Sequence, residues 1–170
     1  MMAGEPITAP GPVGEPTGES PEAVSRFGPE FTWQAVPILV YKEDGAQPPS
    51  FHGVTRQVLY PGDEALPCQL RYFEIADGGH STLERHNHVH VVVVLRGAGR
   101  ALIGDRIVEL APFDIVRITP RAWHQFRATG GKAFGFLCLV NVERDRPERP
   151  DANALEELRS NALVAEFIRS

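Results

Sequence analysis

The chain has 170 residues, of which 42% are hydrophobic and 23% are charged, a balance typical of one globular domain with room for a tail. Its net charge of −5, without a stripe of Lys or Arg, argues against a nucleic-acid partner. The two cysteines do not make a disulfide framework, and no apolar run approaches the roughly 20 residues that a membrane span needs. Without a recognisable secretion signal, we expect a cytoplasmic protein that binds neither nucleic acid nor a membrane.

Residues 1–30 are rich in proline and glycine and poor in large apolar side chains. Ordering such a segment costs more conformational entropy than its burial returns, so we expect a disordered tail. A proline-rich ligand for another protein is the weaker alternative. The folded domain is expected over residues 31–145, and a helical segment over residues 146–170.

Within the expected domain, short apolar runs alternate with turn-forming residues, which predicts a succession of β-strands. The expected strands cover residues 37–42, 52–60, 68–76, 89–96, 100–104, 106–110, 112–119, 123–129 and 133–140. The run at 89–96 is apolar on both faces, so we expect it to be central or sandwiched. Strands joined by short turns at steady spacing predict an all-β protein with a closed or sandwiched antiparallel sheet.

The sequence pattern changes period after residue 150. Asp151 can cap a helix. Apolar residues then recur at roughly helical spacing: Leu155, Leu158, Leu163, Val164 and Phe167. We expect one or two helical segments that pack on the outside of the β domain or on a partner subunit, and a closing helix on the same chain is the simpler interpretation.

Most of the histidines gather in one stretch. Four of the six lie within residues 78–97, and a fifth, His124, begins a later strand. Glu84 and His86 are two residues apart, so on an extended chain they point the same way. A turn after His86 would bring His90 back on the neighbouring strand. We expect these four side chains to hold one divalent transition metal ion, because imidazole and carboxylate suit Fe(II), Mn, Ni, Zn or Cu without selecting sharply among them.

The spacing of these residues resembles the first motif of the cupin superfamily, small β-barrels of jelly-roll type. In that motif, five residues separate a Gly from a first His, one residue separates the first His from a second, three separate the second His from a Glu, and six separate the Glu from a last Gly. The corresponding places are held here by Gly78, Glu84, His86, His90 and Gly97. Glu84 occupies the position where the motif usually has its first His, and His90 occupies the position where it usually has Glu. The set of one carboxylate and three imidazoles is therefore kept once His124 is added.

A weaker second motif follows. His124 and the usual Asp, Asp114, are in place, and Pro120 lies in the turn. Other positions differ, since the usual Gly, Pro, Gly and Asn are replaced by Phe113, Thr119, Arg121 and Ala128. The resemblance covers about residues 35–140 and implies the cupin double-stranded β-helix, here with a C-terminal α-helix. Cupins include dioxygenases, isomerases, lyases, storage proteins and sensors, so the resemblance does not fix the reaction.

The remaining histidines have simpler interpretations. His88 is expected in the turn, at the rim of the site, and it is the reserve ligand if the strand is not bent there. His80 and His52 are expected to be ordinary surface residues.

Several arginines and both cysteines have a functional and a simpler interpretation. Arg71, Arg96 and Arg127 could each bind a substrate carboxylate in a bidentate way, although a solvated outer face is the simpler interpretation for any one of them. Cys138 lies in an apolar run and is expected to be a small core residue, while Cys68 is expected at a strand edge.

The leading hypothesis is a metal-dependent oxidoreductase of dioxygenase type that acts on a small organic molecule in the barrel. Four protein ligands leave open positions on the ion, where a substrate oxygen, water or dioxygen can be polarised. Glu84 is the expected catalytic residue, as a ligand that accepts a proton if it detaches. The alternatives are a non-catalytic sensor or binding module and a metal-dependent isomerase. We also expect a homodimer, because edge strands such as 37–42 and 52–60 need cover.

Overall fold

The computed structural model describes residues 24–42 and 50–170, so most of the predicted tail of residues 1–30 lies outside the described residues. Nine strands and two α-helices follow a 3-10 helix at Pro29–Phe31. The strands are β1 (Leu39–Val40), β2 (His52–Tyr60), β3 (Cys68–His80), β4 (His90–Arg96), β5 (Ala98–Ile103), β6 (Arg106–Leu110), β7 (Ile115–Ile118), β8 (His124–Thr129) and β9 (Phe134–Asn141). The helices are α1 (Ala152–Ser160) and α2 (Ala162–Phe167).

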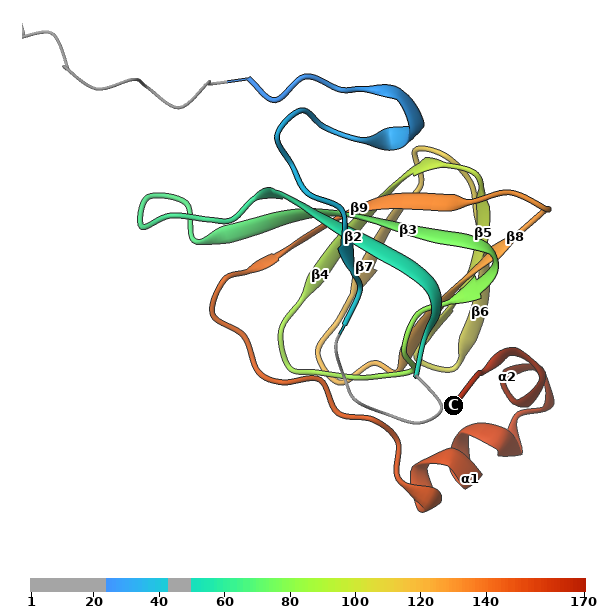
Figure 1. Cartoon of the computed structure of the whole chain (residues 1–170). Coiled ribbons are helices and arrows are strands. Elements are labelled where there is room, and N and C mark those ends of the chain that lie inside the picture. The colour runs from blue at the N-terminus through green and yellow to red at the C-terminus, as the bar shows by residue number, and fades with distance from the viewer. Residues whose placement is uncertain (1–23, 43–49) are drawn as a thin grey trace, which may run out of the picture.

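The strands form one curled antiparallel sheet in the order β6-β5-β8-β3-β9-β4-β7, with β2 paired to β3 and β1 to β2. Strands far apart in the sequence are neighbours, and β9 lies between β3 and β4. Figure 1 shows the sheet rolled around its interior, with both helices at one end. This all-β jelly-roll with a short C-terminal helix pair is the predicted fold class.

The predicted strands match the observed ones closely except at three places. β7 covers only residues 115–118 of the predicted strand 112–119. The predicted strand 37–42 shrinks to β1, since Pro37 has no N–H with which to extend the ladder. β3 runs on to His80 instead of ending at residue 76. The residues that follow the predicted end, Asp77, Gly78 and Gly79, are of turn-forming types, but they lie in a bulge, because His52 pairs with His80 and Val54 with Ile75, which leaves extra residues on β3.

The interior of the barrel holds the main apolar core. Its fully buried members include Ile75, Val94 and Phe134. On the opposite face of β3, Tyr72 is covered by the chain that precedes β1: Phe31 stacks on it at a ring distance of 5.8 Å. Residues 24–30, the described part of the predicted tail, include Phe27, which contacts the Phe31 ring at 5.2 Å.

The C-terminal helices close a second, smaller core on the outside of the barrel. Val164 and Phe167 of α2 pack with Leu83 and Leu102. The side chain of Gln125, fully buried, bonds both the N–H and the C=O of the Arg169 backbone and so ties the end of the chain to β8. The helices therefore pack on their own barrel, as in the simpler interpretation, and no helix among the described residues has the length and apolarity to cross a membrane.

Candidate metal centre

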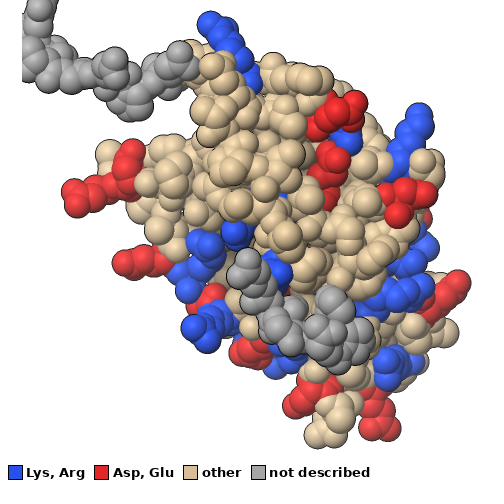
Figure 2. Space-filling view, viewed as in Figure 1, with Lys and Arg blue, Asp and Glu red and all other residues tan. Residues whose placement is uncertain are grey.

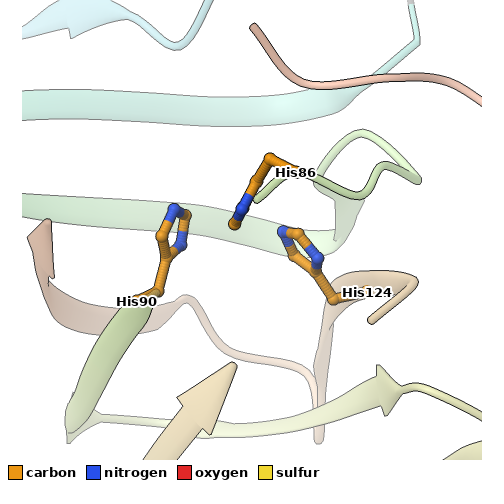
Figure 3. Close-up of side chains that lie close together, drawn as sticks. All are labelled: His86, His90 and His124. Carbon is orange, nitrogen blue, oxygen red and sulfur yellow. The ribbon is translucent and has the colours of Figure 1, made fainter. Parts of the chain in front are cut away.

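Three imidazole rings from three segments meet inside the barrel. His86 follows an isolated bridge between Glu84 and His124, while His90 begins β4 and His124 begins β8. One ligand atom from each of the three histidines lies within 4.8 Å of the others. Figure 3 shows the rings converging from different sides on the space between them. Three predicted ligands are thus brought together by the fold.

Hydrogen bonds to backbone carbonyls fix how two of these rings, those of His86 and His124, face. The Nδ1 of His86 lies 2.8 Å from the carbonyl of His88, and the Nδ1 of His124 lies 3.1 Å from the carbonyl of Ala122. Each ring therefore turns its Nε2 away from the backbone, and the His86 Nε2 is buried without a partner among the described residues. An imidazole with one nitrogen bonded to a carbonyl and the other free is the usual arrangement around a protein-bound metal. The three residues fit a divalent ion.

Burial keeps the three imidazoles neutral. It is the largest cause that lowers the pKa of His86, to about 4, and the neighbouring His124 and His88 lower it further. Burial also lowers the pKa of His90 and of His124, although Glu84 opposes the shift at His124. Neutral imidazole is the form that binds metal, so the site is ready for an ion near pH 7.

Glu84, the predicted fourth ligand and catalytic residue, lies in the same pocket and is 5% exposed. Its backbone pairs with that of His124, and its carboxylate accepts a hydrogen bond from the ammonium of Lys42. The carboxylate is thus beside the triad and neutralised by a cation. Its roles as a ligand and as a catalyst stay predictions.

His88 lies deeper than the expected rim position. Its ring stacks on His86 at 3.6 Å, its Nε2 is 3.0 Å from the His90 Nε2, and its Nδ1 is 2.7 Å from the Asp145 carboxylate. Asp145 also accepts hydrogen bonds from the backbone N–H of Asn87 and His88, and these bonds hold its pKa well below the usual range. The segment after β9 therefore draws His88 inward, which no local pattern around residue 88 indicates.

The triad opens into a cavity of about 190 Å³. Aromatic rings form part of its wall, among them Phe73, Phe126 and Phe136. Four cationic side chains also line it: Lys42, Arg56, Arg71 and Arg144. The cavity therefore combines an apolar wall, a histidine cluster and a concentration of positive charge.

Of the three arginines singled out in the sequence, one faces this cavity. Arg71 lines it and is 8% exposed. Arg96 instead pairs with Glu74 at 2.8 Å, and Arg127 donates to the carbonyl of Phe167 at 2.8 Å. The other two arginines therefore have structural roles.

Cys138 is a cavity residue that the sequence interpretation placed in the core. The Arg71 Nη2 lies 3.2 Å from its Sγ, and the His90 Nδ1 lies 3.7 Å from the same sulfur. Burial raises the pKa of this thiol, and the Arg71 charge works against that shift. Cys138 is indeed buried, but it has polar neighbours. Side chains two residues apart on a strand share a face, so the position of Cys138 two residues after Phe136 could have indicated that it faces the interior of the barrel.

Comparison with known proteins identifies the family. The family model described as "Cupin domain" matches residues 71–140. The 1-methylthio-D-xylulose 5-phosphate methylsulfurylase of Rhodospirillum rubrum is 49% identical over 142 residues, which cover 84% of this chain and 89% of the relative. The chain belongs to the cupin superfamily.

Solved structures and a second relative agree with this assignment. A cupin 2 conserved barrel domain protein from Rhodopseudomonas palustris is 44% identical, with a TM-score of 0.82 over 87% of this chain and all of that one. A cupin-2 domain protein from Rhodospirillum rubrum is 46% identical, with a TM-score of 0.75 over 85% of this chain and 95% of that one. The 5-nitrosalicylic acid 1,2-dioxygenase of a Bradyrhizobium species is 34% identical over 65 residues, which are 38% of this chain and 30% of the relative.

Proposed function

We propose that this protein is a metal-dependent enzyme that removes the methylthio group from a phosphorylated ketose such as 1-methylthio-D-xylulose 5-phosphate. The observation that carries the proposal is the thiol of Cys138, which lies in the cavity between Arg71 and the triad residue His90. The extensive similarity to a methylsulfurylase supports it. Transfer of a methylsulfur group calls for a soft nucleophile, and thiolate sulfur is the one that attacks sulfur most readily.

The neighbours of Cys138 suit it to this role. If His90 binds a metal through Nε2, its Nδ1 carries a hydrogen and faces the sulfur. The guanidinium of Arg71 donates to the same atom. Two donors at one sulfur stabilise the thiolate against the cost of burial. Glu84 lines the same cavity, and we assign it the role of taking up the thiol proton.

In the proposed reaction, the Cys138 thiolate attacks the sulfur of the thioether. A sulfur–sulfur bond forms, the bond between C1 and sulfur breaks, and the electron pair is delocalised onto the adjacent ketone oxygen as an enolate. Glu84 returns the proton to C1, which gives the deoxy ketose phosphate. Cys138 is left as a methyl disulfide, and an external thiol restores it by thiol–disulfide exchange. A divalent ion held by His86, His90 and His124 would supply a Lewis acid beside the substrate oxygens.

The test is a single-turnover experiment on the metal-loaded protein. Protein mixed with 1-methylthio-D-xylulose 5-phosphate, without added thiol, is expected to carry one methylthio group on Cys138 by mass spectrometry. Addition of dithiothreitol should release the group and allow further turnover.

The two cysteines provide the matched variants. Cys138→Ser should form no adduct and no deoxy ketose phosphate, whereas Cys68→Ser should react like the natural sequence, because Cys68 lies at the start of β3 and is not among the cavity residues. Turnover by Cys138→Ser at the natural rate would exclude the proposed mechanism.

A dioxygenase is the second candidate. It is favoured by the histidine triad, which leaves room on an ion for substrate and dioxygen, and by the shorter match to an aromatic-acid dioxygenase. Oxygen uptake with hydroxylated aromatic acids, in the protein loaded with Fe(II), would support this candidate. Isomerisation of the ketose phosphate without loss of sulfur would favour the isomerase alternative, and tight binding without any turnover would favour a sensor.

We also propose that the protein forms a homodimer through its β1 edge. Among the described residues β1 pairs only with β2, and Ile38 and Val40 are 56% and 62% exposed there. An unpaired strand edge with exposed apolar side chains offers a template on which another chain can pair. Light scattering on the eluting protein should give twice the mass of the chain, and a monomeric mass would contradict the proposal.

A further inference from the structure

Three arginines gather on one side of the cavity. Arg56 on β2 and Arg71 on β3 face the interior as diagonal neighbours, since Val58 pairs with Arg71 and Arg56 pairs with Phe73. Arg144 follows β9 and is anchored by the carbonyls of Asn141 and Val142, at 2.9 and 3.0 Å from its Nη1. In Figure 2, Lys and Arg side chains gather at the lower left of the face shown, near the end of β9 in Figure 1.

Within residues 24–42 and 50–170, no carboxylate forms an ion pair with any of these three arginines. The ion pairs formed among the described residues involve other cations. The Nε atoms of Arg56 and Arg71 are buried and have no hydrogen-bond partner among the described residues. Burial and the charges of Arg71 and Arg56 lower the pKa of Arg144.

Clustered guanidinium charges with buried N–H groups that lack an acceptor are costly, and an anion that bridges them recovers that cost. We propose that Arg56, Arg71 and Arg144 form an anion site that binds the phosphate monoester of the substrate. Three guanidinium groups suit a dianion with several acceptor oxygens better than they suit a single carboxylate. The anion site follows from these contacts alone, whereas its assignment to a phosphorylated ketose rests on the proposed function.

The anion site also lies next to the groups proposed to react, Cys138 and the histidine triad. Arg71 contacts Cys138 at 3.2 Å, and Cys138 in turn lies 3.7 Å from His90. A short chain with its phosphate on the arginines therefore reaches past the thiol toward the triad. Binding the phosphate at one end would orient the thioether at the other end, and binding energy from a remote group is a general source of specificity.

The experiment compares D-xylulose 5-phosphate with D-xylulose by calorimetry on the full, metal-loaded chain. The phosphorylated sugar should bind at least about tenfold more tightly, and its affinity should fall with added salt, because charge-assisted hydrogen bonds are stronger than neutral ones and salt screens them. Arg56→Gln and Arg144→Gln should each weaken the phosphorylated sugar by about tenfold or more and leave D-xylulose unchanged. Neither arginine is fully buried, so both variants should fold.

Arg106→Gln, on β6 and outside the cavity, is the control and should bind both sugars like the natural sequence. Inorganic phosphate should raise the thermal midpoint of the natural sequence more than acetate does, and the two arginine variants should lose that difference. If both variants bind D-xylulose 5-phosphate as tightly as the control does, the anion site is wrong. If the affinities follow the prediction while Cys138 never carries a methylthio group, the anion site stands and the proposed reaction fails.

Discussion

The two halves of the barrel interior are built by the same strands but have opposite chemistry. Along each strand the inward-facing side chains change from apolar to polar toward the cavity: Ile75 and Phe73 to Arg71 on β3, Phe134 and Phe136 to Cys138 on β9, Val94 and Val92 to His90 on β4, and Phe126 to His124 on β8. The apolar half contributes buried surface. The polar half holds neutral imidazoles, a thiol and guanidinium groups that have no carboxylate partner among the described residues.

The register of the sheet places this change at the same level on neighbouring strands. Phe73 pairs with Phe136, and one pleat further along Arg71 pairs with Cys138. A step of two residues along a strand therefore separates a stabilising side chain from a functional one. The polar half costs stability, since polar groups without partners are buried there, and the apolar half offsets that cost. Substitution in the apolar half should therefore mainly lower stability, whereas substitution in the polar half should mainly weaken metal binding.

The largest expected effect is on metal binding. His86→Ala or His124→Ala should reduce the bound metal from one ion per chain to none, because two imidazoles rarely retain a transition metal. Metal analysis of protein purified without added metal measures this. His52→Ala, on β2 and outside the cavity, is the control and should keep its metal. Full occupancy in both cavity variants would mean that the ion is held elsewhere.

Phe134→Ala should lower the stability of the protein and leave its metal binding intact. Phe134 is fully buried in the apolar half, so its truncation should cost about 3–5 kcal/mol of unfolding free energy. The folded fraction should still bind metal, since Phe134 is not among the cavity residues. Denaturant unfolding and metal titration of the same sample measure the two quantities. A stable Phe134→Ala protein that has lost its metal would contradict the division between the halves.

Acid should destabilise the metal-free protein through its polar half. The pKa of His86 is lowered to about 4 from its ordinary value of 6.5, so the unfolded chain binds more protons than the folded chain does between those values. The stability associated with neutral His86 is therefore present above pH 6.5 and is lost as the pH falls toward 4. Thermal unfolding across this range should show the loss, and His86→Ala should reduce it. An unchanged pH profile in His86→Ala would contradict the assignment.

The smallest effect is expected at His88. Because the triad without it already supplies three nitrogen atoms, His88→Ala should keep its metal, with affinity reduced by no more than about 10–100-fold through lost support of its neighbours. Competition with a chelator measures the change. Loss of the metal in this variant would show that His88 is a ligand and not a neighbour of the ligands.

Much of the fold and part of the site could be predicted from local pattern. β2 and β6 have the predicted bounds, and the bounds of β4, β5, β8 and β9 lie within two residues of the predicted ones, because period-two alternation and turn residues are properties of short segments. The spacing of Glu84, His86 and His90 also indicated the site. The extension of β3 could not be predicted, because a bulge depends on the strand opposite and Asp-Gly-Gly favours a turn equally well.

The amino-acid sequence by itself determined the strands, their inward and outward faces and the supply of histidines, since these follow from side-chain chemistry and a period of two. The tertiary structure decided which of those side chains meet. Asp145 draws His88 inward, Lys42 neutralises Glu84, and Arg71 reaches Cys138 on a strand far along the chain. Contacts between segments so distant in sequence are set by the register and closure of the sheet, which no short stretch of residues specifies.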